Sequence, residues 1–318
     1  MAGQGVLIIG DLLLDKFIFG DVSRVSPEAP VPLVDIIDEK CTIGGAGNML
    51  NNIRGLGGKP HLISAVGNDL DGDYLLGEMK KMSIESCNIF RDKNLRTTVV
   101  CRVQTPAGYQ LLRLEKNPIM RLSPSTAERI TKSVKSLVCD KRIDVIIISD
   151  YGHGLMVPSL ILDITKIARE AGIKVVVNPK KENFWFYEGV DIIRTNRREA
   201  SYATGITPIN ETSIRNIGSK ILSTLGCRAV VISWVEEGMA LFEQGGRVEF
   251  IPPVIDRFVD LLGVGDAITA TLALSINVSN NFREAAELAN YAGAFVASQK
   301  GLVVVNKDDL RDFISSRS

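Results

Sequence analysis

Cysteine and histidine are scarce in this sequence of 318 residues. Two histidines, His61 and His153, are too few for a His-rich metal site. The five cysteines form no C-x-x-C pair and their number is odd, so we expect free thiols rather than a zinc site or a disulfide framework. The G-x-S-x-G motif is also missing, which argues against a serine hydrolase.

A charge excess and a long apolar run are missing as well. The 37 basic and 37 acidic residues leave no basic surplus of the kind by which proteins bind nucleic acids. No apolar run approaches the ~20 residues that span a bilayer, and the N-terminus carries no basic stretch typical of a secretion signal. We therefore expect a cytoplasmic protein with neither nucleic acid nor membrane as a partner.

Short apolar runs alternate with amphipathic segments along most of the chain. The helical pattern is clearest over 158–172 and 211–226, which both end in glycine, a usual helix stop. Six runs are predicted to be buried strands: 6–11, 61–67, 143–150, 173–179, 190–196 and 228–234. This alternation predicts an α/β fold with a doubly wound, mostly parallel sheet. Periodicity alone leaves a closed barrel as the alternative.

Two segments interrupt the alternation, residues 16–41 and 95–116. They are rich in β-branched residues and contain turn signals such as 105–108, so we predict antiparallel strands in a small separate sheet. Such a sheet could cover a ligand as a lid and offer edges for pairing between two copies. A pair of surface hairpins without a role is the alternative.

The stretch 261-LLGVGDAITA-270 places one carboxylate at the start of an apolar helix. Backbone N–H groups of Gly263, Val264 and Gly265 could bind a phosphate at the positive end of this helix, with Asp266 as a base. The alternative is that Asp266 only caps the helix.

Acidic residues and glycines also follow the predicted strands near the N-terminus, at the edge where open α/β sheets bind ligands. Asp11 and Asp15 could hydrogen-bond a polyol, or lie solvated in a loop. Gly44, Gly45 and Gly47 permit close backbone approach, and Asn48 is predicted to open a helix. A dinucleotide site, with Asp69 at the expected distance, fits less well than a hydroxylated ligand because G-x-G-x-x-G is not matched.

Asn196 and Glu199 follow the strand predicted over 190–196. Three residues apart in a first helical turn, they would point the same way and suit a magnesium ion that carries water and phosphates. A capping box, with Asn196 as N-cap and Glu199 at the third helical position, is the alternative.

These four motifs in this order resemble the ribokinase-like (PfkB) carbohydrate kinase family, and the resemblance covers essentially the whole chain. They are G-D-x-x-x-D at 10–15, G-G-x-G-N at 44–48, N-x-x-E at 196–199 and G-x-G-D at 263–266. The resemblance implies a single ribokinase-like domain over residues 1–318 with the two inserts as its lid. It also implies ATP and Mg²⁺ as cofactors, a monovalent cation as a further candidate, and a homodimer formed through the lid.

The resemblance further implies a role for each matching residue. Asp266 corresponds to the catalytic base, and the N–H groups of Gly263, Val264 and Gly265 to the anion hole around the transferred phosphoryl group. Adenine is expected near 233–239, and Mg²⁺ is expected to be held through Glu199 and water rather than by a cluster of protein ligands. The positions implied for ATP and its magnesium-bound phosphates are Asn196, Arg197, Arg198, Glu199, Ser233, Gly238 and Asn290. Those implied for the sugar substrate are Asp11, Asp15, Gly44, Gly45, Asn48 and Lys180, although Lys180 could also be an ordinary surface lysine.

Within that family, 23-SRVSPEAPVP-32 and 44-GGAGNMLNNIRGLGG-58 resemble kinases of D-glycero-β-D-manno-heptose 7-phosphate. This implies ATP-dependent phosphorylation of the anomeric hydroxyl, giving the 1,7-bisphosphate, a precursor of ADP-heptose and lipopolysaccharide. A kinase of another sugar or sugar phosphate, or a relative with impaired turnover that only binds sugar or nucleotide, are the alternatives.

The sequence departs from the family pattern around the predicted base. Leu262 and Ala267 stand where relatives carry hydroxyl side chains, and Val264 adds a branched side chain beside the phosphate path. Asn178 replaces an expected Asp before Lys180. We expect these changes to affect rate and substrate more than fold, because the anion-hole donors are backbone groups.

Overall fold

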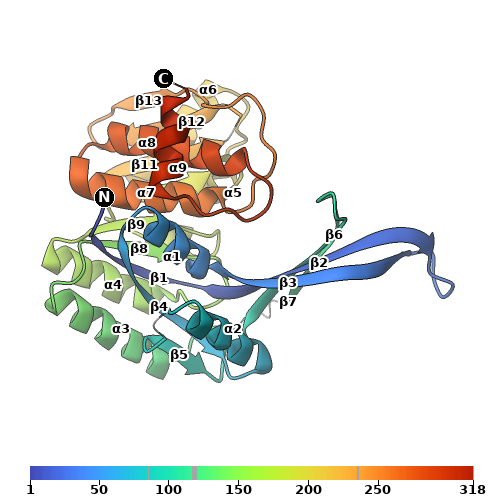
Figure 1. The fold of residues 1–318 in the computed structure, drawn as a ribbon. Helices are drawn as coiled ribbons and strands as arrows, with labels where there is room; N and C mark the ends of the chain where they lie inside the picture. Colours follow the sequence, from blue (N-terminus) through green and yellow to red (C-terminus); the bar gives the residue numbers. More distant parts are fainter. Residues whose placement is uncertain (85, 117–119, 235, 318) are drawn as a thin grey trace.

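The computed structural model describes residues 1–84, 86–116, 120–234 and 236–317. Within these ranges nine strands form one open sheet (Figure 1). In spatial order they are β13 (Val248–Ile251), β12 (Gly238–Glu243), β11 (Ala229–Trp234), β10 (Ile192–Asn196), β9 (Lys174–Asn178), β8 (Val145–Ser149), β1 (Gly5–Gly10), β4 (Lys59–Gly67) and β5 (Ile89–Asp92). Neighbours from β11 to β5 pair in parallel, and β12 and β13 are antiparallel. The predicted α/β fold is confirmed, and the open edges exclude a barrel.

Helices cover both faces of the large sheet because its central strands are apolar on both sides. Along β1, Val6 and Ile8 belong to the core on one face, and Leu7 and Ile9 to the core on the other. The first face carries α1 (Ala46–Gly55), α7 (Val264–Ser279), α8 (Phe282–Ala297) and α9 (Lys307–Ser315), with α2 (Leu70–Lys81) beside β4. The second carries α3 (Pro124–Cys139), α4 (Pro158–Ala171), α5 (Arg197–Thr204), α6 (Glu211–Leu225) and the short 3₁₀ turn η1 (Phe184–Phe186).

The two helices with the clearest sequence pattern end where predicted. Gly172 follows α4 with φ 66° and Gly226 follows α6 with φ 59°, both in the left-handed conformation that glycine adopts without a steric penalty. None of the described helices combines the length and the apolar character needed to cross a membrane.

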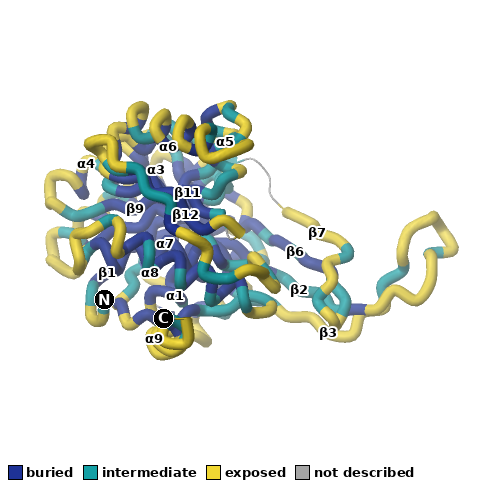
Figure 2. The backbone as a smooth tube through the Cα atoms, turned by 90° about the horizontal axis from the view of Figure 1, so that it is seen from above, coloured by how far each residue is buried: buried dark blue, intermediate teal, exposed yellow. Residues whose placement is uncertain are grey.

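The two interrupting segments form the predicted second sheet, which projects from the body as a long hairpin with two shorter strands (Figure 1). Its order is β3 (Pro32–Gly45), β2 (Leu12–Val25), β6 (Thr98–Gln104) and β7 (Gln110–Lys116). The expectation of purely antiparallel strands is wrong, because β2 and β6 pair in parallel. Both follow strands, β1 and β5, that end at the same edge of the parallel sheet, so both leave that edge in the same direction. Figure 2 shows that the far end of the hairpin is exposed.

Candidate active site

Asp266 lies at the start of α7, at the carboxyl edge of the large sheet. Gly263 precedes the helix with φ 81°, a left-handed conformation that residues with a side chain rarely adopt. Every residue from Ala267 to Ile276 is buried, as the apolar run predicts. The interpretation of Asp266 as a simple helix cap is wrong, because its side chain bonds to two other elements instead.

Two side-chain donors hold the Asp266 carboxylate. Asn48 Nδ2 on α1 donates to Oδ2 at 2.5 Å, and the Tyr151 hydroxyl donates to Oδ1 at 2.6 Å. Asp266 is only 5% exposed, and this burial raises the pKa of its carboxyl group, while the bonds from Tyr151 and Asn48 oppose the rise. The Oδ1 atom of Asn48 is buried without a hydrogen-bond partner, so it is available to accept a bond from a ligand hydroxyl.

Asp11, at the junction of β1 and β2, holds the loop that supplies Tyr151. Its carboxylate accepts backbone N–H bonds from Tyr151 at 2.8 Å, His153 at 3.4 Å and Leu155 at 3.2 Å. Burial raises the pKa of Asp11, and these backbone bonds oppose the rise. Asp11 therefore fixes the backbone of residues 151–155 beside the site.

The other predicted sugar positions lie where β2, β3 and α1 meet. Asp15 is buried and forms an ion pair with Arg102 of β6. Burial raises the pKa of Asp15, and Arg102 opposes this. Crowding explains two of the glycines: a Cβ at Gly44 would lie 2.1 Å from Asp15 Oδ2, and one at Gly45 would lie 2.4 Å from the Asp11 carbonyl oxygen. The helix begins at Ala46, so Asn48 lies in its first turn and does not open it.

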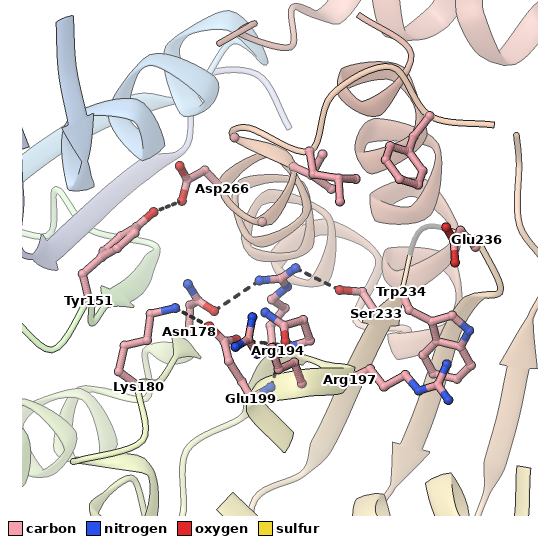
Figure 3. Close-up of a pocket in the computed structure, with 17 residues that line it drawn as sticks. Tyr151, Asn178, Lys180, Arg194, Arg197, Glu199, Ser233, Trp234, Glu236 and Asp266 are labelled. Atoms are coloured by element: carbon pink, nitrogen blue, oxygen red, sulfur yellow. Dashed lines mark hydrogen bonds and ion pairs between the residues drawn. The ribbon is translucent and has the colours of Figure 1, made fainter. Parts of the chain in front are cut away.

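A cleft of about 490 Å³ extends from Asp266 along the ends of β9, β10 and β11 (Figure 3). Of the predicted site residues it is lined by Lys180, Asn196, Arg197, Arg198, Glu199, Ser233, Gly263, Val264, Gly265 and Asp266. Gly238 and Asn290 instead line a narrow neighbouring cavity, to which Ser233 also contributes, and Asn290 Nδ2 donates to the Pro252 carbonyl at 2.8 Å. The range 233–239 expected near adenine flanks both cavities, except position 235, which lies outside the described residues.

Asn196 and Glu199 form a capping box at the start of α5 and also line the cleft. Asn196 Oδ1 accepts the Glu199 N–H at 2.8 Å, and Glu199 Oε2 accepts the Asn196 N–H at 3.4 Å. The alternative raised by the sequence is therefore correct as to local structure. The other Glu199 oxygen pairs with Lys180, which is thereby placed at the cleft and not on an open surface. The described residues contain no group of three or more His, Cys, Asp or Glu side chains able to hold a metal ion.

Sequence reasoning missed two polar residues in the cleft, Tyr151 and Arg194. Arg194 lies in β10 and is 5% exposed; its Nη1 donates to Asn178 Oδ1 at 3.2 Å and its Nη2 to Ser233 Oγ at 2.9 Å. The sequence did contain a signal for Arg194, because it is the one charged residue in β10, a strand of otherwise apolar and neutral residues. Tyr151 carried no comparable signal, because its partner Asp266 is 115 positions away.

Comparison with known proteins agrees with this geometry. A sequence profile described as pfkB family carbohydrate kinase matches residues 8–308. The chain is 35% identical over 300 residues to the bifunctional protein HldE of Geobacter metallireducens, covering 94% of this chain and 61% of that protein. It is 34% identical over 316 residues to the bifunctional protein HldE of Caulobacter vibrioides, covering 99% and 64%. The chain thus spans about three fifths of the length of these curated relatives.

Solved structures with the same fold are more distant in sequence. Phosphofructokinase-2 from Escherichia coli in complex with fructose-6-phosphate superposes with a TM-score of 0.77 at 17% identity, covering 100% of this chain and 99% of that one. A putative ribokinase from Agrobacterium tumefaciens gives a TM-score of 0.77 at 17% identity, covering 99% and 98%. These structures show that the fold is ribokinase-like. The profile match over residues 8–308 shows that the chain belongs to the pfkB family of carbohydrate kinases, enzymes that transfer a phosphoryl group from ATP to a sugar.

Proposed function

We propose that this kinase phosphorylates the anomeric hydroxyl of D-glycero-β-D-manno-heptose 7-phosphate with ATP, a step toward ADP-heptose for lipopolysaccharide. The observation that carries the proposal is a cavity next to the cleft that contains Asp266; three cationic side chains and one carboxylate, Asp260, line this cavity. The resemblance of residues 23–32 and 44–58 to heptose 7-phosphate kinases, and the similarity to proteins named HldE, support the choice of sugar.

Asp266 has the position and the partners of a general base. A carboxylate offers about four acceptor positions, so the bonds from Asn48 and Tyr151 leave room for the sugar hydroxyl. Asp266 takes the hydroxyl proton as the sugar oxygen attacks the γ-phosphorus, and the bond to the bridging oxygen of ADP breaks. At the start of α7, the Val264 N–H donates to the Leu261 carbonyl at 3.4 Å and the Asp266 N–H to the Gly263 carbonyl at 3.1 Å. Gly263 and Gly265 line the same cleft, and the positive end of the helix there suits the charge on the transferred group.

The cleft beside Asp266 suits the phosphates of ATP. Lys180, Arg194, Arg197 and Arg198 give it four cationic side chains, against Glu199, Glu236 and Asp266. One lining carboxylate, Glu199, bonds to Lys180 and to its own helix cap. This fits a magnesium ion that is held mainly by water and phosphate oxygens, as Mg²⁺ usually is in kinases. When bound, the ion would neutralise phosphate charge, and Glu199 would orient its water shell.

The second cavity suits a sugar that already carries a phosphate. It measures about 700 Å³, lies between the small sheet and residues 259–262, and adjoins the cleft because Leu261 lines both. Arg102, Arg113 and Lys300 line it. Arg102 also binds Asp15, so a sugar phosphate in this cavity would lie among residues predicted to bind the substrate. Arg102 and Arg113 already pair with Asp15 and Glu115, whereas Lys300 donates to the backbone carbonyls of Pro106 and Ala107, so a sugar phosphate would supply an anion for Lys300.

The test is turnover of purified protein with ATP, Mg²⁺ and heptose 7-phosphate, read as ADP release with the product identified by mass spectrometry. The Asp266→Asn variant keeps the shape of the side chain but cannot take the proton, and we expect its kcat to fall by about 100-fold or more. No ADP above the Asp266→Asn background would overturn the proposal.

A panel of other sugars and sugar phosphates separates the two alternatives. Turnover of a different acceptor with the same dependence on Asp266 would indicate a kinase of another sugar. Tight binding of ATP and sugar phosphate without turnover would indicate an impaired relative. Such an outcome would fit the apolar Leu262, Val264 and Ala267 around the base.

A further inference from the structure

We propose that Arg194 is a further catalytic residue, whose guanidinium contacts the phosphoryl group as it passes from the nucleotide to the sugar. This inference rests on the proposed phosphoryl transfer in the same cleft. It concerns a residue that none of the family motifs in this sequence contains.

The first reason is that Arg194 is a buried cation without a counter-charge in contact. It is 5% exposed, and its two bonds go to neutral oxygens of Asn178 and Ser233. No carboxylate oxygen of the described residues lies within 4.0 Å of its guanidinium nitrogens, and its Nε has no hydrogen-bond partner. A buried charge is costly unless it is paired, so this arrangement destabilises the protein until an anion enters the cleft.

The second reason is the place of the guanidinium. A Cβ at Gly265 would lie 2.8 Å from Arg194 Nη1 and 3.4 Å from its Cζ. The guanidinium therefore lies against the first turn of α7, one residue from Asp266. In Figure 3 it lies between Asn178 and Ser233, within the cleft and below the start of α7. Two positive groups, the helix terminus and the guanidinium, thus meet beside the predicted base.

The third reason is that Asn178 leaves Arg194 free to bind an anion. An Asp at position 178 would form an ion pair with Arg194 through the oxygen that now accepts its bond. The neutral amide orients the guanidinium but does not neutralise it. In the reaction the γ-phosphorus gains a bond to the sugar oxygen and loses its bond to ADP, whose bridging oxygen keeps the electron pair. Arg194 would donate to the oxygens of the transferred group while Asp266 takes the proton.

The test compares Arg194→Gln, Arg194→Lys and wild type in sugar-phosphate turnover. We expect Arg194→Gln to lower kcat by about 100- to 1000-fold, the loss typical of one missing donor to a developing oxyanion, with a smaller change in KM for ATP. Arg194→Lys should recover about tenfold of this loss, because it restores the charge but not the planar fork. The matched control is Arg215→Gln, which removes an exposed arginine of α6 and should leave kcat unchanged.

Thermal stability separates a catalytic role from a structural one. Removal of an unpaired buried cation should leave the Tm of the ligand-free protein unchanged or raise it, whereas a structural arginine would lower it. The inference is overturned if Arg194→Gln keeps kcat within threefold of wild type, or if Arg194→Lys recovers nothing.

Nucleotide binding keeps the inference testable if the wild type phosphorylates no sugar phosphate. Calorimetry with the magnesium complex of a non-hydrolysable ATP analogue, and with AMP, then replaces turnover. We expect Arg194→Gln to lose at least about tenfold in affinity for the triphosphate analogue and little for AMP, because only the analogue reaches Gly265. An equal loss for both, no loss, or no binding by the wild type would contradict the role of Arg194 and not only the choice of sugar.

Discussion

The hydrogen bond between Tyr151 and Asp266 influences the pKa of the predicted base. Tyr151 is held by its own backbone bond to Asp11, so its hydroxyl reaches Asp266 from a fixed loop. Burial raises the pKa of Asp266, and the Tyr151 bond is the largest of the effects that lower it. Burial and the Asp266 charge raise the pKa of Tyr151 well above its usual value, so the tyrosine stays a donor over the working pH range.

Replacing Tyr151 by Phe should therefore move the pH profile. The base must be ionised, and loss of the Tyr151 bond raises the pKa of Asp266. We expect the acidic limb of kcat/KM to shift to higher pH, with the largest loss of activity at low pH and partial recovery as pH rises. Tyr74→Phe, on α2, is the control and should leave the profile unchanged. A uniform loss of activity at all pH values would show that Tyr151 positions Asp266 without tuning it.

At the scale of elements, the ends of the neighbouring strands β1 and β8 each carry a buried carboxylate. Asp150, after β8, accepts bonds from the Gly152 N–H at 2.8 Å, Asn183 Nδ2 at 3.0 Å and the Tyr187 hydroxyl at 2.7 Å. These bonds connect the loop that contains Tyr151 to residues 183–187 around η1. Burial, and secondarily the Asp11 charge, raise the pKa of Asp150 to about 6.

This raised pKa predicts how the Asp150→Asn variant changes stability with pH. The native carboxyl binds a proton more tightly than the unfolded one, so its favourable contribution is complete below the unfolded pKa of 3.8 and is lost as pH rises through about 6. The amide of the variant does not titrate, so the free energy of unfolding of Asp150→Asn relative to wild type should be about 1 kcal/mol higher at pH 8 than at pH 5. Urea denaturation of both proteins at the two pH values measures this, and a difference independent of pH would contradict it.

At the scale of the whole molecule, strand and helix periodicity predicted the helices on both faces and six of the nine described strands of the large sheet, but not the edge strands β5, β12 and β13. Every predicted strand of the large sheet is present, because a buried parallel strand has a continuous apolar signature. The parallel pairing of β2 with β6 depends on where two distant segments leave the sheet, which no local pattern records. Tyr151 was missed for the same reason, since its partner Asp266 is 115 positions away, whereas Arg194 was missed although its charge stands out within an otherwise apolar and neutral strand.

The projecting hairpin of β2 and β3 bears on assembly. Ile36 and Ile37 lie at a β-bulge of β3, where the pairing with β2 shifts between Phe19 and Gly20, and they are 57% and 61% exposed. A two-stranded hairpin is marginally stable in water unless its apolar side chains are covered. This favours the homodimer through the lid that the sequence predicts. The dimer, like the cytoplasmic location, stays a prediction.

Charging the hairpin should dissociate such a dimer. In a two-fold interface each residue is used twice, so Ile37→Glu removes two apolar contacts and buries two charges, and we expect the dimer dissociation constant to rise by about 100-fold or more. The control is Leu162→Glu on α4, because Leu162 is 62% exposed but lies on the body of the protein. Sedimentation velocity at several concentrations should show a dimer for wild type and Leu162→Glu, and a monomer for Ile37→Glu. A monomeric wild type, or a dimer that persists in Ile37→Glu, would mean that the exposed isoleucines do not mark the interface between the two copies.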